Sequence, residues 1–314
     1  MAVSTPTGNS PLRVVVFDNL RVRSHLFARL FSEHPRFSQI YHPFMMAGFL
    51  GPEGVLPKLR HSETRSKELA EDWQPLWVTD THGSCRRQLE DDVARVEAAG
   101  KNIWVNEHSC LAIRQEVALA HLRGHQYTPQ DLGPNPTYCP DWLFDTCTPM
   151  MVIRHPALSV RSLYDMAIQV QKVRPTDEDF VMCTSLHFCR LLFDLFKSQG
   201  RTPIVADGED VVLRRKGMTD GVCEALGIDP DGVVEQWDPT PLDQRPQHPM
   251  IAAFTKTIHE SHGIEFPNEN NKPVDVETVL DTLVERYGED LAAELKRHID
   301  LSTPDYQYMK QFAV

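Results

Sequence analysis

A short apolar run that ends on a charged residue and a proline constrains the fold of this chain most strongly. Residues 150–153 (MMVI) are continuously hydrophobic, as in a strand buried on both faces of a parallel sheet. Pro156 suits the first turn of a helix, where its missing N–H costs nothing, and helical spacing follows up to residue 166. The stretch therefore predicts a strand that runs into a helix, with Arg154 at the carboxyl end of the strand.

Arg154 and Ser162 form a candidate phosphate site. Ligands of open α/β sheets bind beyond the carboxyl ends of the strands, and both arginine and a helix N-terminus attract phosphate. Ser162 lies two turns into the following helix. The alternative is that Arg154 pairs with an acid in an ordinary loop and that Ser162 is only a tolerated helix residue. Both interpretations stay open on these residues alone.

A second strand, loop and helix unit opens the chain. Residues 12–18 (LRVVVFD) predict the strand, and the loop and helix that follow carry Arg21, Arg23, Ser24 and His25. No Walker-type loop of glycines and lysine is present, which disfavours an ATP or GTP hydrolase. The chemistry of this loop suits a phosphate, because a helix N-terminus offers free N–H groups, a hydroxyl adds a donor and arginine supplies charge. The alternative is that both arginines are solvated charges before a surface helix.

A third strand end carries a histidine. Residues 102–105 (NIWV) predict a strand that stops at a polar stretch ending in His108. A general base at this place would share a cleft with Arg21 and Arg154. A lone histidine is more often structural, but of the fourteen histidines His108 is the one that the strand order favours.

The other patterns complete an α/β fold. Residues 41–54 are rich in aromatics, methionine and glycine without clear periodicity, which suits the wall of an apolar pocket. We predict a three-layer domain with a mainly parallel sheet of four or five strands, helices on both sides and a helical C-terminal region. It spans 1–314 as one domain, with 1–11 as a flexible N-terminus. The remaining elements predicted are helices at 61–72, 83–99, 109–125, 177–199, 218–229, 250–262, 274–287 and 289–299, and a last strand within 203–211.

The composition of the chain disfavours several classes of protein. The net charge of −12 disfavours a protein that binds nucleic acid irrespective of sequence, because such binding needs a basic surface. The seven cysteines are odd in number and form no CxxC pair, so we expect reduced thiols, no disulfide framework and no metal site. The first residues lack the pattern of a signal or transit peptide, and no apolar run is long enough to span a bilayer. We therefore expect a cytoplasmic protein without membrane or nucleic-acid partners.

The three motifs, in their chain order of the Arg21 loop, His108 and Arg154, resemble the sulfotransferases that use 3′-phosphoadenosine 5′-phosphosulfate (PAPS). The wording NPTYCPDWLFDTCTPMMVIRHPALSVRSLYD looks most like fungal sulfotransferase-like proteins found near secondary-metabolite genes. The resemblance covers about residues 12 to 240 and is weakest towards the C-terminal quarter. It implies a P-loop NTPase-like sulfotransferase fold, PAPS as the donor, no metal, and a small-molecule acceptor with a hydroxyl or amine. It leaves a homodimer open.

The resemblance also implies roles for individual residues. His108 matches the catalytic base, and Arg21 would stabilise charge on the leaving phosphate oxygen. The site residues that it implies for the donor are Arg21, Arg23, Ser24, His25, Arg154 and Ser162, with Arg154 and Ser162 on the 3′-phosphate; those for the acceptor are His42, Phe44 and Glu107.

Five departures from the family pattern motivate other functions. They are Leu20, Val22, Arg23, His42 and Asn106, where relatives usually carry Pro, Ser, Gly, an acid and Lys. One alternative is an enzyme of the same fold repurposed for elimination, cyclisation or isomerisation with His108 as the base. Another is a non-catalytic nucleotide-binding relative. A further stretch, 213–217 (LRRKG), looks like the Arg-Lys-Gly loop of animal enzymes, but its surroundings align with an unrelated turn of fungal and bacterial relatives.

Overall fold

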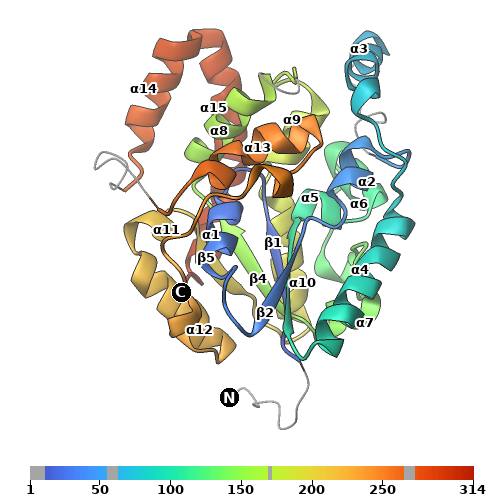
Figure 1. Cartoon of the computed structure of the whole chain (residues 1–314). Coiled ribbons are helices and arrows are strands. Elements are labelled where there is room, and N and C mark those ends of the chain that lie inside the picture. The colour runs from blue at the N-terminus through green and yellow to red at the C-terminus, as the bar shows by residue number, and fades with distance from the viewer. Residues whose placement is uncertain (1–10, 55–62, 169–171, 265–272) are drawn as a thin grey trace.

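Five parallel strands form one sheet in the computed structural model, which describes residues 11–54, 63–168, 172–264 and 273–314 (Figure 1). The spatial order of the strands is β2-β3-β1-β4-β5. Their bounds are β1 Arg13–Asp18, β2 Phe37–Tyr41, β3 Asn102–His108, β4 Thr148–Ile153 and β5 Ile204–Asp207. Each pair of neighbours runs parallel, which confirms the predicted sheet.

Helices follow the strands and build the C-terminal region, as predicted. They are α1 Ser24–Leu30, α2 Met45–Leu50, α3 Glu63–Trp73, α4 His82–Ala98, α5 Ser109–Ala112, α6 Gln115–Leu122, α7 Asp141–Thr146, α8 Pro156–Met166, α9 Glu178–Thr184, α10 His187–Ser198, α11 Asp210–Leu213, α12 Arg215–Leu226, α13 Pro249–Glu260, α14 Val276–Tyr287 and α15 Glu289–Lys310. Among the described helices, none is both long and apolar enough to cross a membrane.

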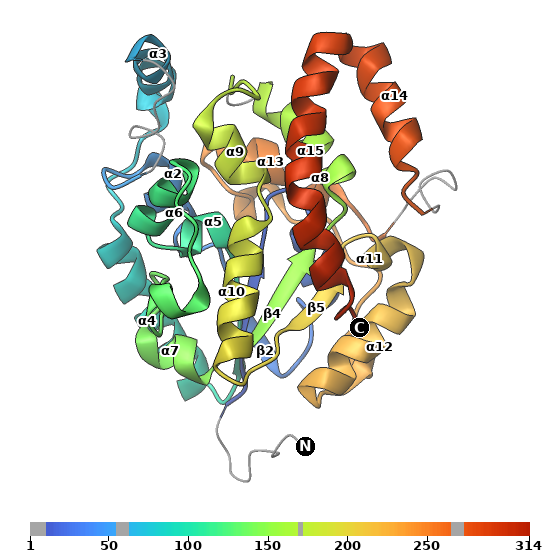
Figure 2. The ribbon, with the colours of Figure 1, turned by 180° about the vertical axis from the view of Figure 1, so that it is seen from behind.

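The core lies on both faces of the sheet because successive strand residues point to opposite sides. Val14 and Val16 of β1 pack into an apolar cluster with α1 and α12, whereas Val15 and Phe17 pack into the cluster that includes α10 and α15. Figure 1 shows α1 and α12 on the near side of the sheet, and Figure 2 shows α10 and α15 covering the other. This arrangement confirms the predicted three layers.

Several element boundaries differ from the sequence prediction. β2 was not recognised, because it is a five-residue edge strand that pairs only with β3 and has one fully buried position. The stretch predicted as an irregular wall contains α2, with its buried residues packed against the core. The helices predicted over 109–125 and 177–199 are each broken into two, with extended backbone at Ile113 and Ser185.

The sheet brings the predicted site residues to one edge. Parallel pairing places Asp18 opposite His108 on β3 and opposite Val152 on β4, and places Ile153 opposite Asp207 on β5. The strands therefore end together, and the residues after them share the carboxyl edge of the sheet. The predicted single domain stays a prediction, and its flexible N-terminus falls on residues 1–10, outside the described residues.

Candidate functional site at the carboxyl edge of the sheet

Polar side chains at this edge form two groups. We call one the histidine half, on the side of β1 towards β3 and β2, and the other the arginine half, on the side towards β4 and β5. The histidine half consists of Asp18, His25, His42, Glu107 and His108; the arginine half consists of Arg21, Arg23, Arg154, Ser162 and Glu209.

The loop between β1 and α1 alternates buried apolar residues with arginines. Leu20 and Val22 are 5% and 0% exposed and anchor the loop in the core. Arg21 and Arg23 adopt left-handed backbone conformations, with φ of 64° and 67°. Such conformations cost non-glycine residues on the order of 1 kcal/mol or more and cluster at functional sites. Arg23, which replaces the glycine of relatives, thus keeps a backbone that glycine favours.

A close approach fixes this loop against the turn after β5. A Cβ atom on Gly208 would lie 2.1 Å from the carbonyl oxygen of Val22, so only glycine fits there. Arg23 donates from Nη1 to the Gly208 carbonyl at 3.1 Å. The turn after β5 and the loop after β1 are therefore one packed unit, although they lie 185 positions apart.

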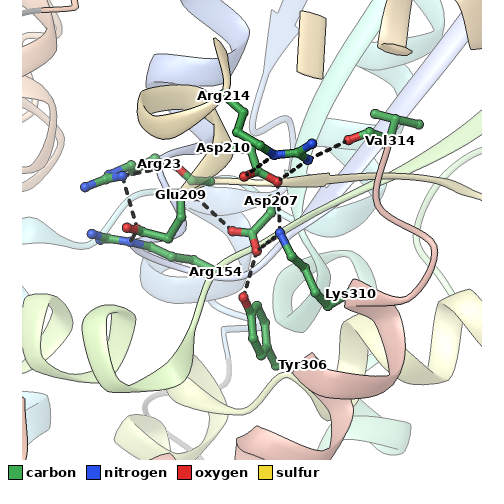
Figure 3. A network of polar contacts seen from close by, with 10 residues as sticks. Arg23, Arg154, Asp207, Glu209, Asp210, Arg214, Tyr306, Lys310 and Val314 are labelled. Carbon is green, nitrogen blue, oxygen red and sulfur yellow. Dashed lines mark hydrogen bonds and ion pairs between the residues drawn. The ribbon is translucent and has the colours of Figure 1, made fainter. Parts of the chain in front are cut away.

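The arginine half brings together residues from three strand ends (Figure 3). Arg21 donates from Nε to Ser162 Oγ at 3.1 Å, and Arg154 donates from Nη1 to the Arg21 carbonyl at 3.2 Å. Arg154 Nε also donates to Glu209 Oε1 at 2.7 Å, and Arg23 Nη1 lies 3.1 Å from the same oxygen. Ser24, 5% exposed, begins α1 beside this loop. Arg154 thus pairs with an acid and also lies among the predicted phosphate ligands.

Three guanidinium groups lie close together in this half, and two of them, those of Arg23 and Arg154, share the carboxylate of Glu209. Burial and the neighbouring charge of Arg154 lower the pKa of Arg21. The same two causes lower the pKa of Arg23 to about 10, against the opposing effect of Glu209. Buried cations that repel one another are stabilised by an anion placed between them. The arginine half is therefore suited to bind a phosphate or a sulfate ester.

The C-terminal helix braces this half (Figure 3). Asp207 is 1% exposed, and its Oδ1 accepts a hydrogen bond from the Glu209 backbone N–H at 2.9 Å. Its Oδ2 accepts from the Tyr306 hydroxyl at 2.7 Å and pairs with Lys310 Nζ at 2.8 Å, both on α15. These contacts orient the turn that carries Glu209.

The stretch 213–217 lies at the junction of α11 and α12. Arg214 pairs with Asp210 at 2.9 Å, Arg215 with Glu235 at 2.9 Å and Lys216 with Asp220 at 2.8 Å. Each cation of the stretch therefore pairs with a different acid.

His108 and Asp18 form the centre of the histidine half. His108 Nδ1 makes a close contact with Asp18 Oδ1, and the two residues are 7% and 0% exposed. Burial alone would lower the pKa of His108, but Asp18, with smaller contributions from Cys110 and Glu107, raises it to about 9. An ionised carboxylate only accepts hydrogen bonds, so Nδ1 is the donor. Within the described ranges, His108 Nε2 has no hydrogen-bond partner.

Two more imidazoles stand beside His108. The His42 ring stacks on it with centroids 4.2 Å apart, and His25 meets His42 edge-on at 5.0 Å. Burial, followed by the charges of His42 and His108, lowers the pKa of His25 well below its usual value. His42 has a left-handed φ of 42°. The ring that replaces the acid of relatives is thus part of a histidine cluster.

Glu107 and Phe44 lie deeper than the sequence prediction placed them. Glu107 accepts from the backbone N–H groups of Phe44 at 2.6 Å and of His108 at 2.8 Å. Both residues are 0% exposed, and Glu107 is buried because strand β3 continues to His108. Neither residue presents a surface to an acceptor in this structure; Glu107 instead braces the segment that carries His42.

Three neighbours of the site were not predicted. Asp18 is the last residue of β1, Glu209 follows β5, and the Phe254 ring of α13 lies 5.9 Å from the Arg21 guanidinium. Asp18 and Glu209 are acids at strand ends, the same position that identified His108 and Arg154. Phe254 lies within a helix, and no sequence pattern indicated that it lies near the site.

Comparison with known proteins identifies sulfotransferase relatives. The chain is 22% identical to the sulfotransferase ppzF of Metarhizium majus (strain ARSEF 297) over 293 residues, which cover 83% of this chain and 84% of the relative. It is 20% identical to the sulfotransferase ppzF of Metarhizium rileyi (strain RCEF 4871), over 74% of this chain and 76% of the relative. No family model matches the chain. The similarity supports a sulfotransferase-type enzyme.

Two solved sulfotransferase domains are also similar to this structure. One is from the curacin biosynthetic pathway, with 12% identity, a TM-score of 0.41, and coverage of 93% of this chain and 97% of that domain. The other is from the Synechococcus PCC 7002 olefin synthase, with 14% identity, a TM-score of 0.38, and coverage of 96% and 98%. Both TM-scores are low, and the fold class rests on the strand order of the chain itself.

Proposed function

We propose that this chain, a relative of the fungal sulfotransferases, transfers a sulfuryl group from PAPS to a hydroxyl or amine of a small-molecule acceptor. The observation that carries the proposal is the cluster of Arg21, Arg23 and Arg154, in which Arg23 and Arg154 share the carboxylate of Glu209 and Arg21 donates to the Ser162 hydroxyl. Such an excess of buried positive charge fits the phosphates of the donor. The histidine half supplies the base that the transfer requires.

Each half has its own part in the proposed reaction. Arg154 and Ser162 hold the 3′-phosphate, and Arg23, Ser24 and His25 surround the 5′-phosphosulfate. Arg21 stabilises the negative charge that develops on the departing phosphate oxygen. These contacts align the donor for in-line transfer, which depends mainly on positioning and charge stabilisation.

His108 acts as the general base. Its Nε2, which has no hydrogen-bond partner in the described part of the chain, takes the proton of the acceptor group. The acceptor oxygen or nitrogen bonds to sulfur as the bond between sulfur and the phosphate oxygen breaks. His42 lines the acceptor side through its stack on His108. The products are a sulfated acceptor and 3′-phosphoadenosine 5′-phosphate.

Incubation with sulfur-labelled PAPS and a library of phenols, alcohols and amines tests this function directly. Transfer of label to an acceptor, lost in the Arg21→Ala variant, is the expected result. Absence of transfer and absence of nucleotide binding together would overturn it. We further propose that the protein works in the cytoplasm on a secondary metabolite, as a monomer or homodimer, without nucleic acid or membrane.

The histidine cluster also supports a second candidate function, an enzyme of this fold that does not use PAPS. His25, His42 and His108 with two buried acids provide base chemistry that does not depend on a donor. An enzyme repurposed for elimination, cyclisation or isomerisation would therefore show His108-dependent conversion of a substrate without added PAPS. The labelled assay and a donor-free assay on the same library separate the two functions.

A further inference from the structure

We propose that Asp18 is the positioning residue of His108: it holds the Nδ1 proton, leaves Nε2 as the nitrogen that accepts the acceptor's proton, and stabilises the imidazolium that forms. The inference rests on the proposed function and concerns a residue to which the family resemblance gave no role. It assigns the pair a function beyond packing.

The sheet itself fixes the pair. Asp18 and His108 are the last residues of neighbouring parallel strands and are register partners, so no loop has to order for them to meet. Both side chains are nearly or fully buried, and Nδ1 contacts Oδ1 directly. A base held by two strands has its ring orientation set before any acceptor binds, which favours a fast transfer.

The environment of Asp18 makes His108 the main compensation for its charge. Asp18 Oδ2 is buried and has no hydrogen-bond partner among the described residues. The adjacent Asn19 does not supply one, because its Nδ2 donates to the Thr184 carbonyl at 3.0 Å. A buried carboxylate with one contact is costly unless its partner carries positive charge. The pair is therefore most stable with a proton on each ring nitrogen of His108.

Other titratable groups near His108 modulate this preference. Glu107 on β3 and Cys110 on α5 raise the pKa of His108, as Asp18 does. His42, after β2, stacks on the ring, and His25 on α1 meets His42. A positive charge on His42 or His25 would oppose one on His108. Among the residues that the structure describes, Asp18 is the acid whose side chain contacts the ring directly.

The transfer step balances with this pair. When His108 is neutral, Nδ1–H donates to Asp18 and Nε2 has a free lone pair. The acceptor proton moves to Nε2 as the acceptor bonds to sulfur, and the electron pair of the broken bond stays on the phosphate oxygen near Arg21. The resulting imidazolium is stabilised by Asp18, as in other carboxylate and histidine pairs.

The Asp18→Asn variant removes the negative charge of the side chain and keeps its size and shape. The amide oxygen still accepts from Nδ1–H, but it does not compensate an imidazolium. Asp177→Asn is the matched control, because Asp177 is also buried and pairs with Arg65 at 3.0 Å, while it does not contact His108. His108→Gln identifies the His108 signal among the fourteen histidines in NMR titrations of the full chain.

Three readouts test the proposal. In the parent, the NMR titration midpoint of His108 is expected near 9, and in Asp18→Asn it should fall by more than one pH unit. The acid limb of the rate profile should shift down in parallel, and kcat at high pH should fall about 10-fold or more, with KM for the donor unchanged. Asp177→Asn should lower the melting temperature without moving either titration.

The outcomes also separate this inference from the proposed function. An unchanged His108 midpoint in a folded Asp18→Asn variant would overturn the role of Asp18, even if sulfuryl transfer is normal. Failure of the parent to bind 3′-phosphoadenosine 5′-phosphate would overturn the proposed function, while the NMR titration would still report on the pair. If Asp18→Asn does not fold, Asp18→Glu serves instead. The Asp18→Glu variant should misplace the His108 ring, so that kcat falls while the NMR titration midpoint of His108 stays above 7. A His108 midpoint at or below 6.5 would count against the proposal.

Discussion

The two halves of the carboxyl edge differ in burial and have opposite balances of charge: the histidine half is mostly buried, whereas the arginines are half-buried. In the histidine half, Asp18 and Glu107 compensate any proton that the imidazoles carry. In the arginine half, Arg23 and Arg154 share the carboxylate of Glu209, while Arg21 donates to the Ser162 hydroxyl. The first half is electrostatically complete without a ligand, whereas the second is completed by an anion. We therefore propose that proton transfer and donor binding belong to separate parts of one edge.

The two halves also differ in the structural elements that position their side chains. Asp18 and His108 end paired strands, so the sheet positions both. The arginines lie in loops and after strand ends, and Glu209 depends on a turn that α15 braces through Asp207 (Figure 3). We therefore expect mutations to separate rate from donor affinity according to the half in which they fall.

The largest expected effect is on turnover in the histidine half. His108→Ala should lower kcat by about 10²- to 10⁴-fold, the usual range for losing a general base, with donor affinity nearly intact. His34→Ala is a matched control, because His34 is also buried but contacts the Asp229 carbonyl at 3.0 Å. It should cost stability without this loss of rate. Near-normal turnover in the His108→Ala variant would contradict the assignment of proton transfer to the histidine half.

The next effect is a pH dependence of stability. The pKa of His108 is raised in the folded state, so its pairing with Asp18 stabilises the protein fully below about pH 6.5 and this contribution is lost as pH rises through about 9. The loss should amount to roughly 3 kcal/mol. Denaturant unfolding at pH 6 and pH 9.5 measures it. An equal pH dependence in His108→Gln would show that other groups cause it.

Donor affinity tests the arginine half. Arg154→Ala should weaken binding of 3′-phosphoadenosine 5′-phosphate by about 2 kcal/mol, or roughly 30-fold, because a charge-assisted contact is lost. Calorimetry measures this affinity. Arg13→Ala is the control, since Arg13 also pairs with an acid, Glu97 at 2.6 Å, but at the amino end of β1. Unchanged affinity in a folded Arg154→Ala variant would remove the phosphate role of Arg154.

The smallest effect concerns the shared acid. Glu209→Gln removes the carboxylate that competes with phosphate for Arg23 and Arg154, so donor affinity should rise severalfold, by about 1 kcal/mol. The melting temperature without nucleotide should fall, because the buried cations lose their partner. Calorimetry and thermal melts on the same variant measure both. Weaker donor binding would mean that Glu209 acts mainly to orient the arginines.

The sequence predicted the fold and much of the edge because apolar runs mark buried strands. The runs before Arg154 and His108 identified β4 and β3, and together with β1 they predicted that distant residues meet, as Arg21 and Ser162 do across 141 positions. β2 was missed because an edge strand with partly exposed residues lacks such a run.

Side-chain partners at the edge could be predicted less well. The contact of Asp18 with His108 depends on strand order and register, which a single sequence does not reveal. The pairing of Glu209 with two arginines depends on the turn at Gly208, where Val22 approaches closely. Glu107 was expected to face the acceptor, but backbone N–H groups occupy both of its oxygens.

The most direct test of the division between the halves is a comparison of two nucleotides by calorimetry on the parent protein. If Arg154 and Ser162 hold a 3′-phosphate, 3′-phosphoadenosine 5′-phosphate should bind at least about 30-fold more tightly than adenosine 5′-phosphate, since only the first makes that charge-assisted contact. The same preference should persist in His108→Ala. Equal affinities for the two nucleotides, or a preference that disappears in His108→Ala, would contradict the account.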